Sequence, residues 1–180
     1  MEGDAEHSDA GLRHVDAYTD GACIGNPGPG GYGVVLRFGD HRRELSGGYR
    51  KTTNNRMEIL AAITALEALK EPCTVSLYSD SEYLVRMMQG GWPRQWEAHG
   101  WRRKSGAALN PDLWGALLRL CDKHQVEFIW VRGHAGNPEN ERCDRLAVRA
   151  AQQPDLPIDD GYEQPDTHVD NLFATRHDGA

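Results

Sequence analysis

Apolar and polar residues alternate in three short segments near the start of the chain, at residues 15–20, 32–38 and 42–49. Alternation of this kind, with Val, Tyr and Phe among the residues, is typical of strands that bury one face. Gly39 and Asp40 supply a turn between the second and third segments. The pattern therefore predicts an antiparallel meander of three strands.

The rest of the chain alternates helical segments with short apolar runs. Apolar side chains three and four positions apart predict helices at residues 53–70, 81–89, 112–125 and 138–153. Two apolar runs between them, at residues 74–80 and 126–131, have the length of buried strands. Strands that alternate with helices in this way predict an α/β fold.

Four acidic residues occupy unusual positions in these predicted elements. Asp20 and Asp80 each end an apolar run, in YTD and YSD, and open α/β sheets bind ligands at the carboxyl ends of their strands. Glu58 and Asp144 stand on helix faces that are otherwise small and apolar. The residues at helical spacing are Ala62, Ala65 and Leu69 for Glu58, and Ala147, Val148 and Ala151 for Asp144.

A single acid in such a position is more often a cap or half of an ion pair, but four together indicate a metal site. Two carboxylates about 4 Å apart repel by roughly 4 kcal/mol at an effective dielectric constant of about 20. Four converging carboxylates would therefore destabilise the fold without cations. Oxygen ligands favour Mg2+ or Mn2+ over zinc, and two such ions about 3.5 to 4 Å apart suit phosphodiester hydrolysis.

The net charge of −7 is unevenly distributed over the 180 residues. Residues 1–11 carry −4 and residues 152–180 carry −6, which leaves +3 for residues 12–151. The central segment is therefore compatible with a polyanionic partner although the whole chain is acidic. We expect one folded domain at residues 14–153, a disordered lead-in at 1–13 and an acidic, disordered tail at 154–180. An alternative role for the tail is competition with nucleic acid for a basic face.

Composition argues against several other classes of protein. Cys23, Cys73, Cys121 and Cys143 stand singly, without a C-x-x-C pair, so the sequence predicts reduced thiols rather than a zinc knuckle or a disulfide framework. No apolar run approaches the roughly 18 residues that a membrane span needs, and the N-terminus lacks the apolar core of a signal peptide. We therefore expect a cytoplasmic protein without a membrane partner.

Residues 91–104, GWPRQWEAHGWRRK, interleave three tryptophans with four cationic side chains. Aromatic rings among cations suit a nucleic-acid backbone and its sugars. The same pattern fits a helix that packs its tryptophans inward and leaves a solvated basic edge. The sequence leaves both interpretations open.

His134 lies in the glycine-containing loop GHAGNPENE, residues 133–141. A mobile imidazole on such a loop can move protons or help a product to leave. A surface histidine without a function is the alternative.

The segment GPGGYG at residues 28–33 satisfies the G-x-G-x-x-G pattern of dinucleotide-binding proteins. Such a fingerprint should open a helix, but here it leads into the strand predicted at residues 32–38. We therefore expect no nucleotide cofactor.

Four motifs, taken in order, resemble the bacterial ribonuclease HI family, the type 1 ribonucleases H. They are YTDGACIGNPGPGGYG, TTNNRMEILAAITALEALK, SDSEYLV and WVRGHAGNPENERCDRLA, and the match runs from about residue 15 to residue 151. The resemblance implies a ribonuclease H-like fold, in which a five-stranded mixed sheet joins an antiparallel three-strand meander to parallel strands and is flanked by helices. It also implies a monomeric endonuclease that cleaves the RNA strand of RNA/DNA hybrids with two Mg2+ ions, for which Mn2+ can substitute, and leaves 5'-phosphate and 3'-hydroxyl ends.

The resemblance assigns roles to individual residues. The implied metal ligands are Asp20, Glu58, Asp80 and Asp144, and His134 matches the mobile histidine of the family; these five are the implied catalytic residues. Asp20 is expected to bridge both ions.

Ten further residues match substrate-binding positions of the family. Groups near the RNA 2'-hydroxyls, which distinguish RNA from DNA, fall on Cys23, Asn26, Asn54 and Asn55. The pocket that grips a DNA phosphate falls on Lys51, Thr53 and Asn110, and the channel beside the DNA strand falls on Tyr83, Trp92 and Trp96. The glycines that follow Asp20 are expected to let backbone amides reach the RNA minor groove.

The chain departs from the family pattern in three places. Residues 97–110, EAHGWRRKSGAALN, carry fewer cations than the best-known bacterial members and include Glu97, so we expect weaker and more salt-sensitive hybrid binding. Glu82 stands where a Gln is familiar, and we expect no N-terminal hybrid-binding module. A non-catalytic module that binds hybrids is the alternative function, although a binder would gain nothing from four mutually repelling carboxylates.

Overall fold

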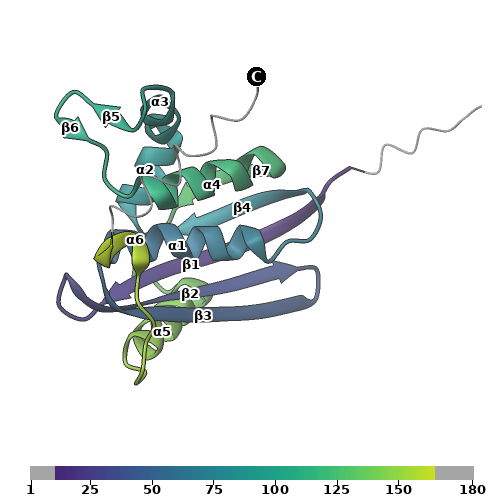
Figure 1. Cartoon of the computed structure of the whole chain (residues 1–180). Coiled ribbons are helices and arrows are strands. Elements are labelled where there is room, and N and C mark those ends of the chain that lie inside the picture. The colour runs from purple at the N-terminus through teal and green to yellow at the C-terminus, as the bar shows by residue number, and fades with distance from the viewer. Residues whose placement is uncertain (1–10, 165–180) are drawn as a thin grey trace, which may run out of the picture.

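A computed structural model describes residues 11–164 and contains a five-stranded mixed sheet in the order β3-β2-β1-β4-β7 (Figure 1). Strands β1 (Arg13–Cys23), β2 (Gly28–Phe38) and β3 (His41–Thr52) form an antiparallel meander. Strand β4 (Cys73–Ser79) pairs in parallel with β1, and β7 (Gln125–Trp130) pairs in parallel with β4. The predicted meander and the mixed five-stranded sheet are confirmed.

Three strand boundaries differ from the prediction by three or four residues, and one of them is the end of β3, at Thr52 instead of Tyr49. Strand β2 begins at Gly28, so much of the expected glycine loop is strand, and β1 continues past Asp20 to Cys23. The register pairs Asp20 with Gly33 and Cys23 with Gly30. Glycine has no side chain to alternate between the two faces of a sheet, so the apolar pattern could not reveal this part of the ladder.

Helices cover both faces of the sheet. Helix α1 (Asn54–Glu67) packs on one face and α5 (Pro138–Ala151) on the other, while α4 (Pro111–Lys123) lies beside α1 (Figure 1). Neighbouring glycines of β2 show the two faces: a Cβ on Gly30 would lie 2.9 Å from the Met57 side chain of α1, and a Cβ on Gly31 would lie 2.2 Å from the Ala147 carbonyl of α5.

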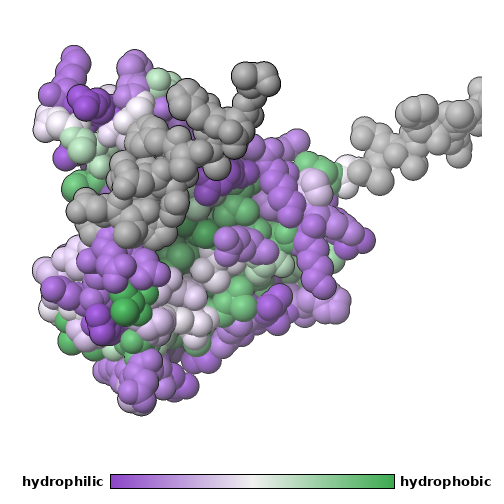
Figure 2. All heavy atoms as spheres, viewed as in Figure 1, coloured by the Kyte–Doolittle hydropathy of each residue, from purple (hydrophilic) through white to green (hydrophobic). Residues whose placement is uncertain are grey.

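The main core lies between the sheet and the two helices α1 and α4. Its largest fully buried side chains include Trp114, Met57, Ile59, Leu66, Leu77 and Leu117. Hydrophilic side chains cover most of the rim of the face seen in Figure 2, and hydrophobic ones gather in its middle, over α1 and the strands behind it. Within residues 11–164, no helix is both long enough and apolar enough to cross a membrane.

A smaller region extends from one end of the sheet (Figure 1). It consists of α2 (Glu82–Gln89), α3 (Trp92–Ala98) and a two-stranded hairpin of β5 (Arg102–Arg103) and β6 (Gly106–Ala107). Ser81 caps α2, because its hydroxyl accepts a hydrogen bond from the Leu84 amide at 3.2 Å. Helix α3 carries Trp92 and Trp96 of the basic segment, and Trp101 lies between this helix and the hairpin.

The C-terminal segment, defined here as residues 155–164, includes the short helix α6 (Asp160–Glu163). This segment falls within the predicted tail, and the structure places it against β3 and α1: the Arg50 amide donates to the Pro157 carbonyl at 2.9 Å. Residues 1–10 of the expected lead-in and residues 165–180 of the expected tail lie outside the described residues. The division of the chain into lead-in, domain and tail stays a prediction.

Candidate active site

Three acidic side chains from three elements converge at the edge where β1 and β4 stop pairing. Asp20, Glu58 and Asp80 each bring a carboxylate oxygen to within 4.8 Å of the other two. The parallel register ends with Thr19 opposite Ser79, so the next residue of each strand is one of these acids. Sequence reasoning placed Asp20 at a strand end, but it is the parallel pairing that ends there, because β1 continues along β2.

Glu58 reaches this edge because α1 begins very close to β1. A Cβ on Gly21 would lie only 2.5 Å from the Glu58 amide nitrogen, so the helix can approach the strand only where the strand has no side chain. Ala62 and Ala65 on the same face are fully buried, as predicted. Leu69 lies beyond the last residue of α1 and is only partly buried.

Burial and the charges of neighbouring acids strongly disfavour the charged forms of Asp20 and Glu58. Asp20 is 6% exposed and Glu58 is 3% exposed. Burial, followed by the charges of Asp80 and Asp144, raises the pKa of Asp20 to about 8, although the Gly21 amide donates to its carboxylate at 2.8 Å. Burial and the charges of Asp20 and Asp80 raise the pKa of Glu58 well above its usual range.

The arrangement fits a divalent cation. The Oε2 atom of Glu58 is buried and has no hydrogen-bond partner among the residues that the structure describes. A buried oxygen without a donor is costly, and a hard cation satisfies such oxygens and removes the repulsion between them. Carboxylate oxygens are the ligands that Mg2+ and Mn2+ prefer, so Asp20, Glu58 and Asp80 are suited to hold one of these ions.

Asp144 stands beside the three acids but outside the closest group. It lies on α5 and is half-buried, and its charge contributes to the raised pKa of Asp20. Ala147 and Ala151 are buried as predicted, but Val148 is 37% exposed. The sequence pattern placed Val148 on the same apolar face as Ala147 and Ala151, and this was wrong. Asp144 lies at the edge of the face that α5 packs on the sheet, and Val148, one turn later, lies on the solvent side of that edge.

Two residues that sequence reasoning missed hold Asp80. The Asn140 amide nitrogen Nδ2 donates to Asp80 Oδ2 at 3.3 Å, and the Trp130 indole donates to the Asp80 carbonyl at 3.2 Å. Asn140 is 3% exposed and lies four residues before Asp144 on α5. A polar residue one helical turn from a predicted ligand is the signal that could have identified it.

His134 is exposed on the loop that follows β7. Its φ of 53° is in the left-handed region, which is unusual for a residue other than glycine. The preceding Gly133 passes close to the site, since a Cβ there would lie 2.7 Å from Asp80 Oδ2. The loop therefore adjoins the carboxylates, while a catalytic role for His134 stays a prediction.

The predicted contacts to RNA lie between the β1–β2 turn and the start of α1. The Asn26 side chain accepts a hydrogen bond from the Asn54 amide at 3.1 Å, so two residues far apart in sequence meet there. Asn55 is exposed beside them. The Cys23 thiol donates to the Thr52 carbonyl at 3.4 Å, and burial raises its pKa.

The start of α1 also brings together the predicted phosphate ligands. Thr53 caps the helix by accepting from the Arg56 amide at 3.3 Å, and Lys51 is exposed two residues earlier. The Asn110 side chain accepts from Arg56 Nη1 at 3.4 Å. The first turn of α1 contains no acidic residue, so its N-terminal dipole and the Lys51 charge both favour an anion.

The structure supports the packing interpretation for part of the tryptophan-rich segment, and its contact with nucleic acid stays a prediction. Trp96 and Tyr83 are partly buried against the fully buried Trp114, at ring-centroid distances of 6.5 and 5.7 Å. Trp92 is 47% exposed and, with Trp96, lines a hollow of about 850 Å³. The cations on the wall of this hollow are Arg102, Arg103 and Lys104.

Gly31 and Gly33 of β2 pack against α5, while the expected approach of backbone amides to RNA stays a prediction. A Cβ on Gly33 would lie 2.2 Å from the Cys143 carbonyl, and one on Gly31 would meet α5 equally closely. These glycines face α5, so they let that helix lie on the sheet. The segment from Gly28 to Gly33 is strand and does not open a helix, contrary to what a dinucleotide fingerprint requires.

Comparisons with known proteins agree with this geometry. A family model described as RNase H matches residues 13–152. The "Ribonuclease H" of Syntrophus aciditrophicus (strain SB) is 64% identical over 151 residues, which is 83% of this chain and 87% of that protein. The "Ribonuclease HI" of Synechocystis sp. (strain ATCC 27184 / PCC 6803 / Kazusa) is 59% identical over 150 residues, which is 82% of this chain and 94% of that protein.

Solved structures are also similar to most of this chain. LC9-RNase H1, a type 1 RNase H with the type 2 active-site motif, is 37% identical with a TM-score of 0.71 and covers 80% of this chain and 74% of that one. LC11-RNase H1, solved in complex with an RNA/DNA hybrid, is 28% identical with a TM-score of 0.61 and covers 76% of this chain and 96% of that one.

Proposed function

Because the chain belongs to the ribonuclease H family of enzymes, we propose that it is an endonuclease that hydrolyses the RNA strand of RNA/DNA hybrids by a two-metal-ion mechanism. The products carry 5'-phosphate and 3'-hydroxyl ends. The observation that carries the proposal is the convergence of Asp20, Glu58 and Asp80, with a buried Glu58 oxygen that has no partner among the described residues. Such a cluster is costly for folding and useful for binding cations.

In this proposal, Asp20, Glu58, Asp80 and Asp144 hold two Mg2+ ions. Asp20 is the shared ligand, since its carboxylate interacts with each of the other three acids. When bound, the ions supply activation of the attacking water and stabilisation of the leaving 3'-oxygen. The protein contributes fixed positions: α1 presents Glu58 over Gly21, and hydrogen bonds from Asn140 and Trp130 hold Asp80.

Groups around the carboxylates orient the substrate and move protons. Asn26, Asn54 and Asn55 face the RNA 2'-hydroxyls, and the N-terminus of α1 with Lys51 binds a phosphate of the DNA strand. Trp92 and Trp96 border the channel for the DNA strand. His134, on the loop beside Asp80, accepts or delivers a proton as product leaves.

A cleavage assay with an end-labelled RNA/DNA hybrid tests the proposal directly. We expect cuts within the RNA strand in the presence of Mg2+, with Mn2+ as a substitute and loss of activity in a chelator. Single-stranded RNA and double-stranded RNA should remain intact. Hybrid binding without cleavage would instead support the alternative function, a non-catalytic module.

Replacement of Asp20 by Asn tests the shared ligand. Asp20→Asn keeps the side-chain shape and removes the charge, so we expect an intact fold and retained hybrid binding but no cleavage. Asp16→Asn is the matched control: Asp16 lies on the same strand, its carboxylate faces His14, and its replacement should leave activity unchanged. Substantial Mg2+-dependent activity in Asp20→Asn would refute the assignment.

We also propose that the enzyme works as a cytoplasmic monomer without a nucleotide cofactor. The segment from Gly28 to Gly33, which resembles a cofactor fingerprint, is part of strand β2, and two of its glycines pack against α5. This arrangement supports the absence of a nucleotide site in the segment. Light scattering over a range of protein concentrations measures the oligomeric state, and a mass that rises with concentration would contradict a monomer.

A further inference from the structure

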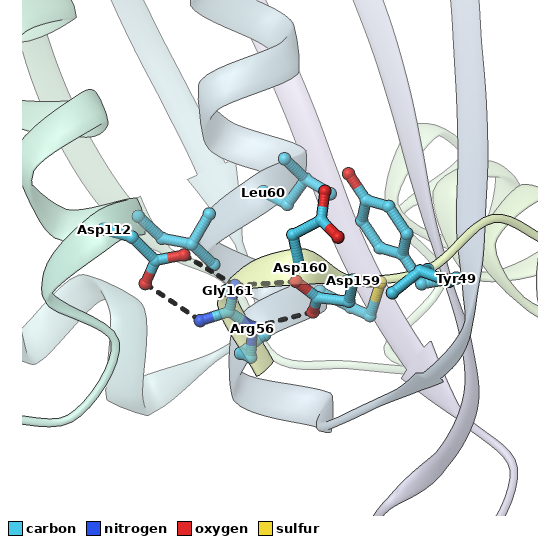
Figure 3. A pocket seen from close by; sticks show the side chains of 10 residues that line it. Tyr49, Arg56, Leu60, Asp112, Asp159, Asp160 and Gly161 are labelled. Carbon is cyan, nitrogen blue, oxygen red and sulfur yellow. Dashed lines mark hydrogen bonds and ion pairs between the residues drawn. The ribbon is translucent and has the colours of Figure 1, made fainter. Parts of the chain in front are cut away.

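Arg56 is a buried cation on α1 that links three parts of the chain. Its Nε and Nη2 donate to the Asp159 carboxylate at 2.7 and 2.8 Å, and its Nη1 and Nη2 donate to Asp112 at 3.0 and 2.7 Å (Figure 3). Nη1 also donates to the Asn110 side chain at 3.4 Å. The side chains of Arg56 and Asp159 are 3% and 6% exposed, so this is a buried, bidentate ion pair rather than a surface contact.

Asp159 also holds the end of β3. The Thr52 hydroxyl donates to Asp159 Oδ2 at 2.6 Å, and the Arg50 amide donates to the Pro157 carbonyl of the same C-terminal segment. Successive side chains of a strand point to opposite sides, so Lys51 lies on the side opposite to Thr52 and is exposed. The C-terminal segment therefore fixes the residues on both sides of Lys51 without covering it.

The groups held by this network adjoin the proposed phosphate site. Thr53, which caps α1, follows Thr52 directly, and Asn110 is bonded to Arg56 itself. Lys51, Thr53 and Asn110 thus come from two separate segments that meet through Arg56. The network therefore sets the position of one segment relative to the other.

We propose that Asp159 is a positioning residue for phosphate binding: through Arg56 and Thr52 it holds Lys51, Thr53 and Asn110 in the arrangement that accepts a phosphate of the DNA strand. The inference rests on the proposed function and adds a residue to it. Charge alone predicts the opposite effect, because removing a carboxylate from the neighbourhood of a phosphate should strengthen binding. The direction of the change therefore separates positioning from simple electrostatics.

The test compares Asp159→Asn with Asp160→Asn, which removes the same charge one residue further on. Asp160 is exposed, and its side chain points away from Arg56 (Figure 3). For Asp159→Asn we expect KM for the hybrid to rise about tenfold, which corresponds to the loss of one charge-assisted contact. We expect kcat to stay within about twofold of the wild-type value. For Asp160→Asn we expect KM to stay unchanged or fall.

A second measurement identifies the phosphate. Uncharged methylphosphonate groups are placed one at a time in the DNA strand, and KM is measured for each hybrid. In the wild-type protein we expect KM to rise at one position, and in Asp159→Asn we expect that rise to be largely lost. If Asp159→Asn does not fold, Thr52→Val replaces it in the test, because this substitution removes only the hydroxyl that donates to Asp159. We expect Thr52→Val to raise KM and to weaken the methylphosphonate effect in the same direction, but by less.

The outcomes distinguish the two levels of the proposal. A wild-type protein that does not cleave the hybrid would refute the proposed function. If the wild type cleaves but Asp159→Asn and Thr52→Val keep the wild-type KM and its full response to methylphosphonate, the positioning role alone is wrong. Absence of any methylphosphonate effect in a wild type that cleaves would also overturn it.

Discussion

Without a bound metal ion, the surroundings of Asp20 and Glu58 favour the protonated forms of both carboxyl groups. Asp20 and Glu58 are nearly inaccessible to water and lie beside further acids. A metal ligand must be charged, so the raised pKa of each residue measures how strongly the metal-free site resists ionisation. Bound cations reverse that balance, which couples metal binding to the release of protons.

The metal-free protein should lose stability as the pH rises. The folded-state pKa of Asp20 is raised from 3.8 to about 8, so the folded state binds its proton more tightly than the unfolded state does. This contribution is fully present below about pH 4 and is lost as the pH approaches about 8. We expect urea denaturation in a chelator to show a decreasing free energy of unfolding across that window.

Asp20→Asn serves as the control for this pH dependence, because Asn cannot titrate. We expect its free energy of unfolding to fall less steeply between about pH 4 and about pH 8 than that of the wild type. Addition of Mg2+ at pH 8 should stabilise the wild type more than the variant. Equal slopes for both proteins would show that Asp20 does not keep a raised pKa.

At the scale of elements, close packing of α5 on the meander depends on glycines of β2. A Cβ on Gly33 would lie 2.2 Å from the Cys143 carbonyl and 2.8 Å from the Leu146 Cβ, and backbone atoms of a helix cannot yield independently. We expect Gly33→Ala to lower the free energy of unfolding by about 3 kcal/mol, as overpacking does. Cleavage should fall as well, because α5 carries Asp144 and Asn140.

Gly115→Ala is a matched control for this substitution. A Cβ on Gly115, in the buried part of α4, would meet its nearest neighbour at 3.4 Å, an ordinary contact. Alanine favours helix over glycine, so we expect unchanged or slightly increased stability. Thermal unfolding of both variants measures the difference, and a Gly33→Ala protein as stable as the wild type would contradict the packing argument.

Elements with a clear local composition could be predicted from the sequence, and elements that rely on glycine or on distant contacts could not. The helix at residues 53–70 corresponds closely to α1 because the segment is rich in strong helix formers and begins with a capping residue, Thr53. The strand at 74–80 corresponds closely to β4 because it is a short apolar run with the length of a buried strand.

The early start of β2 could not be predicted because Gly28, Gly30 and Gly31 have no side chain that would show an alternating pattern. The contact of Gly31 and Gly33 with α5, a helix more than 100 positions away, is likewise not visible in any local pattern.

At the scale of the whole molecule, the candidate site depends on contacts between remote parts of the chain. Asp20, Glu58 and Asp80 could be identified from the sequence because each interrupts an apolar pattern, and a charge in such a place needs an explanation. The signal for Asn140, its position one helical turn before Asp144, is weaker, because a neutral amide near a helix start is ordinary. The pair Arg56–Asp159 spans 103 positions, and no local pattern indicates that these two charges meet.

The ion pair between Arg56 and Asp159 predicts how far the chain can be truncated at its C-terminus without loss of stability. A chain that ends at residue 154 loses Asp159 and leaves the buried Arg56 with Asp112 alone, so we expect its free energy of unfolding to drop by about 3 kcal/mol. A chain that ends at Gln164 keeps the network and should match the full-length protein in stability. Urea denaturation of both truncated proteins checks the difference.

The chain that ends at Gln164 also tests whether the acids beyond it compete with nucleic acid. Residues 165–180 carry Asp166, Asp170 and Asp178 against Arg176. If these acids are simply solvated, hybrid affinity at low salt should change by less than about twofold, because exposed charges beyond the contact surface are screened. Binding that tightens several-fold on truncation, and loses that advantage at high salt, would instead show that the acidic tail occupies the basic face of the enzyme.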